Sequence, residues 1–184
     1  MGTAKPSRNS SGALSLEQVC NAFDAVKPPN WTYFHDPQRT RFGEDVAYAS
    51  ESIRIGLRGD CDDFAVLVAG CIRAIGGACR IALTYAEHGT GHAFAEVYVG
   101  DARNTIAASQ YIMRRYSVVH VFCQYDQKTA GWWLSLDWSG SNSGQYPGQD
   151  PLIDPNAALR FLYVPIHSAA DFARTQRLPV PSVP

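Results

Sequence analysis

The sequence has no excess of charge of either sign. Its 16 Lys and Arg residues are balanced by 17 Asp and Glu residues, for a formal net charge of −1, and neither sign gathers in a run. Proteins that bind nucleic acid or anionic membrane surfaces need clustered positive charge to neutralise phosphates. We therefore expect neither nucleic acid nor a membrane among the partners.

Long apolar segments and targeting signals are also lacking. No segment approaches the roughly 18 apolar residues that a membrane span requires. Residues 1–12 have no apolar core of a signal peptide, and Pro6 stands where a myristoylation motif needs Ser or Thr. The five cysteines show no disulfide spacing, which favours a reducing compartment. We expect a cytoplasmic protein; a soluble fragment of a longer protein and a delivered effector are the alternatives.

The chain length of 184 residues predicts one folded domain. Residues 1–12 are polar and show no hydrophobic period, so we expect them to be disordered. Residues 179–184 form a loose tail rich in proline. The predicted folded domain therefore spans residues 13–178.

The hydrophobic period changes from helical to alternating along the chain. Helical spacing marks residues 14–26, 45–55, 61–75 and 105–115. Alternation predicts strands at residues 80–85, 92–99, 118–125, 132–137 and 159–166. Helices followed by antiparallel strands predict an α+β fold, with the helix that begins at Cys61 packed on the sheet.

Cys61 lies in residues 59–65 (GDCDDFA), where a glycine turn leads into the most apolar helix. Free backbone N–H groups and the positive end of the helix dipole favour a thiolate there over a thiol. The same N–H groups can bind an oxyanion. The alternative is a buried structural cysteine, a role that we assign to Cys71 in the middle of the helix.

An imidazole and a carboxylate complete the constellation. His92 begins a strand after a glycine, and His88 and His120 are its competitors, although His120 fits strand packing better. Asp137 interrupts an apolar strand, which is costly unless the carboxylate has a partner such as His92. The alternative for Asp137 is a turn-initiating role before Ser139. A thiol, an imidazole and a carboxylate in this order are the groups needed for acyl transfer through a thioester.

The sequence predicts no cofactor and no metal ligand. Acidic residues at the start of a helix act as caps and dipole partners, which accounts for Asp60, Asp62 and Asp63; a hard-cation site is the alternative. The other cysteines do not have the close pair spacing of zinc sites.

Four segments together resemble the transglutaminase-like superfamily of papain-like cysteine enzymes. They are residues 59–65, 72–80 (IRAIGGACR), 91–97 (GHAFAEV) and 133–137 (WLSLD). The resemblance extends over about residues 31–147 and implies a papain-like core. It implies that Cys61 is the nucleophile, His92 the general base and acid, and Asp137 the carboxylate that orients His92.

The resemblance carries further implications and one departure. Residues 31–37 resemble the aromatic segment before the cysteine in bacterial members, and Trp31 is a candidate oxyanion donor, with plain packing as the alternative. Some bacterial members are proteases that bind calcium near the acidic residues beside the cysteine, which keeps Asp60 and Asp62 open as ligands. Residues 105–115 resemble an inserted helix that would cover the cleft.

We expect cysteine-dependent acyl chemistry on an amide of a protein or peptide substrate, with hydrolysis by a protease or amidase favoured. Transamidation is the alternative within the same chemistry, because both reactions use the same catalytic groups. A non-catalytic binding module of the same fold is the alternative from another class. The sequence does not indicate an oligomeric state.

Overall fold

The structure is a computed structural model, and it describes residues 14–35, 47–85, 91–139, 145–151 and 160–165. Its helices are α1 (Leu16–Val26), α2 (Ala49–Arg54), α3 (Cys61–Ala74) and α4 (Ala102–Tyr116). The described part of the chain contains no helix both long and apolar enough to cross a membrane.

Five strands form one antiparallel sheet in the order β5-β6-β4-β3-β7. They are β3 (Cys79–Tyr85), β4 (Gly91–Gly100), β5 (Cys123–Asp126), β6 (Gly131–Leu136) and β7 (Arg160–Pro165). A separate parallel pair joins β1 (Thr32–Tyr33) to β2 (Arg58–Gly59). The long central strand β4 lies between β3 and β6, so residues from both neighbours meet its first residues.

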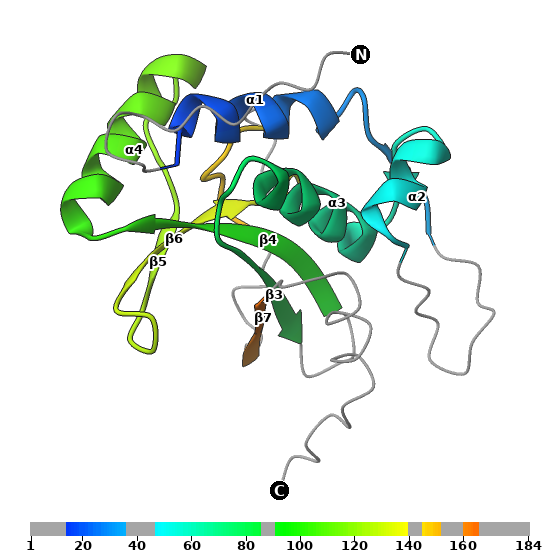
Figure 1. The fold of residues 1–184 in the computed structure, drawn as a ribbon. Helices are drawn as coiled ribbons and strands as arrows, with labels where there is room; N and C mark the ends of the chain where they lie inside the picture. Colours follow the sequence, from blue (N-terminus) through cyan, green and yellow to red (C-terminus); the bar gives the residue numbers. More distant parts are fainter. Residues whose placement is uncertain (1–13, 36–46, 86–90, 140–144, 152–159, 166–184) are drawn as a thin grey trace, which may run out of the picture.

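The helix α3 lies between the sheet and α1 (Figure 1). One side of α3 packs on β4, whose Ala93, Ala95 and Val97 belong to the core. Phe23 of α1 meets Phe64 of α3 edge to face, with ring centroids 6.2 Å apart. Because apolar contacts surround α3, the position of its first residue, Cys61, is fixed relative to the sheet.

The α+β class is confirmed, as is a helix beginning at Cys61 and packed on an antiparallel sheet. The terminal segments 1–12 and 179–184 lie outside the described residues, so their predicted disorder stays a prediction. The predicted helix at residues 105–115 is present as the longer α4.

The strand predicted at residues 118–125 is wrong in its first half, because β5 begins only at Cys123. The carbonyl of Phe122 still accepts from the N–H of Ser135 in β6 at 3.4 Å, but the N–H of Phe122 donates to the carbonyl of Gly148 at 2.6 Å, and the N–H of Gly148 donates to the Ser135 carbonyl at 2.7 Å. A strand placement for His120 is therefore also wrong. Its ring lies exposed and pairs with Asp150, with 3.0 Å between Nε2 and Oδ1.

Candidate active site

The first part of the site is the entry into α3. Gly59 closes the short strand β2 with φ +157°, and a Cβ there would collide with the carboxylate of Asp63. The strand β1 runs beside it, where the N–H of Phe34 donates to the Gly59 carbonyl at 2.8 Å. The turn and its neighbour therefore set the direction in which α3 leaves, with Cys61 half-buried at its first position.

At the start of α3, the N–H of Asp63 donates to Asp62 Oδ1, which leaves the amides of Cys61 and Asp62 without a partner among the helix carbonyls. The first intrahelical bond that reaches back past Cys61 runs from Phe64 N–H to the Asp60 carbonyl. The earlier N–H groups of a helix have no partner within it. The amides of Cys61 and Asp62 are thus the natural donors to an oxyanion formed by attack of the Cys61 sulfur.

His92 and Asp137 meet because β4 and β6 are antiparallel neighbours. Ala95 pairs with Leu136, so the residues that follow β6 lie beside the first residues of β4. His92 Nε2 lies 2.7 Å from Asp137 Oδ2. Asp137 is only 1% exposed, so this carboxylate is removed from solvent and depends on protein partners.

A serine that sequence reasoning treated only as a turn residue joins this pair. Ser139 donates its backbone N–H to Asp137 Oδ1 at 3.0 Å, and its Oγ lies 2.8 Å from the same oxygen. Ser139 Oγ also lies 3.0 Å from His92 Nε2. The signal in the sequence is an Asp followed two residues later by Ser, which is the spacing of an Asx turn.

The Cys61 sulfur also acts on the His92 ring. Burial alone lowers the pKa of His92, but hydrogen bonds to Asp137 and Cys61, together with their negative charges, raise it to about 10. Asp137 occupies Nε2, so Nδ1 is the ring nitrogen left for the thiol. The imidazole therefore lies between the Asp137 carboxylate and the Cys61 sulfur, which is the order of groups that lets an imidazole exchange a proton with a thiol.

The carboxylate of Asp137 stays ionised despite its burial. Burial acts to raise the pKa of Asp137, and the His92 hydrogen bond and charge, with the two Ser139 donors, bring it below its usual value. The lowered pKa of Asp137 is consistent with the raised pKa of His92, since each partner favours the charged form of the other. The structure thus brings the three predicted residues together in the order thiol, imidazole, carboxylate.

His120, the competing histidine that the structure describes, does not lie at this position. His120 pairs with Asp150 on the surface, and His88 lies outside the described residues. All five cysteines are free thiols. Burial raises the pKa of Cys20 and Cys71, and raises it to about 12 in Cys79 and about 11 in Cys123. His92, and not His120, is therefore the histidine that interacts with the half-exposed Cys61.

Trp31 packs rather than faces an open site. It is 3% exposed, and its ring lies edge to face against Phe64 at 5.2 Å. Its Nε1 is buried and finds no hydrogen-bond partner among the described residues. A buried indole N–H does not reach a substrate in this conformation, so the packing interpretation is favoured.

A half-exposed thiol at the start of a central helix, next to an imidazole that is paired with a buried carboxylate, is the arrangement that cysteine-dependent acyl chemistry requires. A profile of the transglutaminase-like superfamily matches residues 5–134, which include Cys61 and His92 and end just before Asp137. The chain belongs to this superfamily, which in general comprises cysteine-dependent enzymes of the protease and transglutaminase type. Comparison with curated protein sequences gave no significant match.

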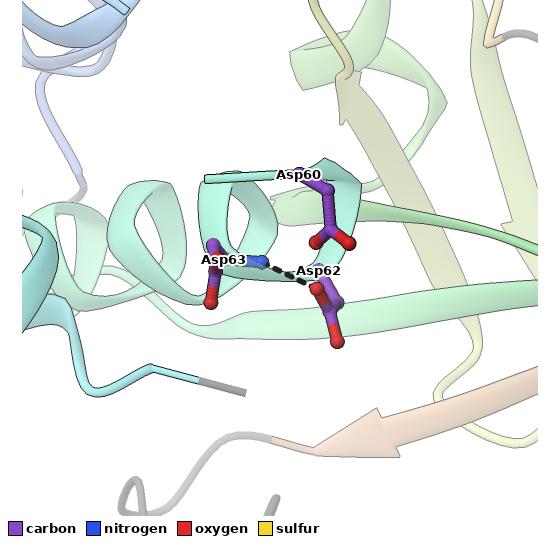
Figure 2. A group of neighbouring side chains, drawn as sticks. All are labelled: Asp60, Asp62 and Asp63. Atoms are coloured by element: carbon purple, nitrogen blue, oxygen red, sulfur yellow. Dashed lines mark hydrogen bonds between the residues drawn. The ribbon is translucent and has the colours of Figure 1, made fainter. Parts of the chain in front are cut away.

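Three carboxylates gather in the first turn of α3, beside Cys61 (Figure 2). One oxygen each of Asp60, Asp62 and Asp63 lies within 4.8 Å of the others. Asp60 makes no side-chain cap bond to the helix, so its predicted capping role is wrong. Instead Asp62 Oδ1 accepts from the N–H of Asp63, and Asp63 Oδ1 accepts from the N–H of Ala47. Two members of the cluster, Asp62 and Asp63, are thus held by backbone N–H groups, whereas Asp60 is not.

Two oxygens of this cluster fit a hard cation. Within the part of the chain that the structure describes, Asp60 Oδ1 and Asp62 Oδ2 are buried without a hydrogen-bond donor. Burial, followed by the neighbouring carboxyl of Asp60, holds the pKa of Asp62 far above its usual range. An ion of the calcium type takes carboxylate oxygens and would relieve this repulsion. Asp60 and Asp62 are the residues that would hold it.

We expect Asp62→Asn to raise the melting temperature in the presence of a chelator. A carboxyl with a raised folded-state pKa contributes stability only below its unfolded pKa, and that contribution is lost as the pH rises. An amide keeps the bond to Asp63 N–H without the charge. We also expect calcium in the millimolar range to raise the melting temperature of the wild type and not that of Asp62→Asn.

Asp150→Asn is the matched control, because Asp150 is an exposed acid outside the cluster. It should respond to calcium as the wild type does. Thermal unfolding followed by circular dichroism checks both variants. An unchanged melting temperature of the wild type in calcium would remove this ion from the description of the site.

Proposed function

We propose that the protein hydrolyses an amide bond of a protein or peptide through a thioester on Cys61. The observation that carries this proposal is the 2.7 Å hydrogen bond between the His92 ring and the buried Asp137 carboxylate, together with the action of the Cys61 thiol on the same ring. Each group has the partner that its chemical role requires. Membership of the superfamily supports the general chemistry of the cysteine.

In the first half of the reaction, the Cys61 thiolate attacks the carbonyl carbon of the amide. Negative charge develops on the carbonyl oxygen, where the N–H groups at the start of α3 stabilise it. His92 donates the proton on Nδ1 to the amide nitrogen, the C–N bond breaks, and the amine leaves. A thioester remains on the sulfur, and His92 is neutral.

In the second half, water attacks the thioester carbon while neutral His92 accepts its proton on Nδ1. The C–S bond breaks, the carboxylic acid product leaves, and the thiolate–imidazolium pair is restored. Asp137 keeps the other proton of the ring on Nε2 throughout, which leaves Nδ1 free to exchange protons with substrate and water. A primary amine in place of water would give transamidation with the same groups.

This proposal is tested by measuring whether water or an added amine attacks the thioester. The purified protein is incubated with a library of glutamine-containing peptides, with and without hydroxylamine or a primary amine, and the products are identified by mass spectrometry. Hydroxylamine should intercept the thioester as a hydroxamate, and without it the free acid should form. We expect the acid to remain the main product when the primary amine is present.

The alternatives give different products. An amine adduct as the main product would assign the protein to transamidation and contradict hydrolysis. Absence of acid, adduct and hydroxamate with every peptide, together with saturable peptide binding, would contradict both reactions and indicate a binding module. Cleavage within the peptide backbone, rather than at a side-chain amide, would identify a protease.

A further inference from the structure

We propose that Ser139 is a positioning residue whose hydroxyl holds the Asp137 carboxylate and the His92 ring in one fixed arrangement. This inference rests on the proposed function. Ser139 follows β6 by three residues. Because β6 and β4 are antiparallel, it lies at the end of the sheet where β4 begins. Its Oγ lies 2.8 Å from Asp137 Oδ1 and 3.0 Å from His92 Nε2.

The two contacts of the hydroxyl select one arrangement of protons. A hydroxyl has a single proton to donate and accepts with its lone pairs. Asp137 is ionised and only accepts, so the proton of Ser139 goes to Asp137 Oδ1. The lone pairs of Oγ then face His92 Nε2, which must itself carry a hydrogen. The reverse arrangement would leave the bare Nε2 facing Asp137 Oδ2 at 2.7 Å, lone pair against lone pair.

This selection matters because it leaves the other ring nitrogen, Nδ1, for the thiol. With its hydrogen fixed on Nε2, the neutral ring offers a basic Nδ1 toward Cys61 and the substrate. The backbone N–H of Ser139 also donates to Asp137 Oδ1, but any residue except proline would supply that bond. The specific contribution of serine is therefore its hydroxyl, which Ser139→Ala removes without removing the turn.

Ser135 offers a matched control for this substitution. It is fully buried, and its Oγ accepts from the N–H of Asp137 at 3.4 Å. Ser135→Ala thus removes a hydroxyl from the same neighbour, at the main chain rather than at the carboxylate. Both variants are checked by thermal unfolding before their kinetics are compared.

We expect kcat of Ser139→Ala to fall about tenfold with KM unchanged, because one hydrogen bond to a charged group is lost only from the catalytic pair. The titratable groups acting on His92 are Asp137 and Cys61. With Asp137 less firmly held, the pKa of His92 should fall, and the alkaline limb of the kcat profile should move to lower pH. Ser139→Thr keeps the hydroxyl and should restore both, and Ser135→Ala should match the wild type.

The pKa of His92 is measured by NMR titration of its ring, assigned with His92→Gln, and requires no substrate. A lower pKa in Ser139→Ala, restored in Ser139→Thr, supports the positioning role. The same ring titration in Ser139→Ala and in the wild type would overturn it, and so would equal losses in the Ala and Thr variants. Because this readout is independent of turnover, it separates failure of the Ser139 proposal from failure of the proposed hydrolysis.

Discussion

Cys61→Ala is expected to abolish turnover and thioester formation while leaving the melting temperature nearly unchanged. Loss of a nucleophile from such a triad costs on the order of a millionfold in kcat. The sulfur lies half-buried at the first position of α3, so its removal leaves the core contacts of the helix in place. The hydroxamate assay measures the chemistry, and thermal unfolding measures the stability.

Cys71→Ala is the matched control for Cys61→Ala. Cys71 lies on the same helix, packed against the core, and burial raises the pKa of its thiol. Its removal should leave turnover intact and lower the free energy of unfolding by about 1–2 kcal/mol through a small cavity. Turnover that survives in Cys61→Ala would disprove the nucleophile assignment, whatever the geometry of the site.

Asp137→Asn is expected to lower kcat by about 10³–10⁴-fold without unfolding the protein. The amide has the same shape as the carboxylate, but it can donate to Nε2 and so move the ring hydrogen to Nδ1. That tautomer presents a hydrogen instead of a lone pair toward Cys61. The substitution also removes the charge that raises the pKa of His92 to about 10, so the pKa should fall.

The pH dependence of stability gives a second measurement on this variant. The folded-state pKa of His92 lies above its ordinary value of 6.5, so the stabilisation is fully present below pH 6.5 and is lost as the pH rises through about 10. Urea unfolding of the wild type should therefore show a decrease over this window that Asp137→Asn lacks. Identical slopes in the two proteins would show that His92 and Asp137 are not coupled as the geometry indicates.

The elements that place the site could be predicted because their signals are local. The apolar spacing of α3 and the glycines that follow it fix a helix from Cys61, and alternation marks β3 and β4. The α+β class follows from the order of these segments. The proximity of His92 and Asp137 to Cys61 required more than periodicity, and the superfamily motifs supplied it.

The features that the sequence did not predict depend on contacts between distant segments. The strand β5 starts late because Phe122 bonds to Gly148, which lies far along the chain. Asp63 binds the backbone of Ala47, and Asp60 leaves the helix uncapped, although both were expected to act within α3. Ser139 resembles an ordinary turn residue until the pairing of β4 with β6 brings His92 beside it. The secondary-structure preferences of neighbouring residues do not predict these contacts between distant segments.

Electrophilic labelling tests most directly whether Cys61 is the activated nucleophile. The native protein is treated near neutral pH with a limiting amount of a chloroacetamide derivative of a glutamine peptide, and the adduct is located by peptide mass mapping. Burial raises the pKa of each of the other cysteines, Cys20, Cys71, Cys79 and Cys123. We predict a single adduct on Cys61, formed much more slowly in His92→Gln. First labelling at Cys71 or Cys123, or a rate at Cys61 that does not depend on His92, would contradict the account.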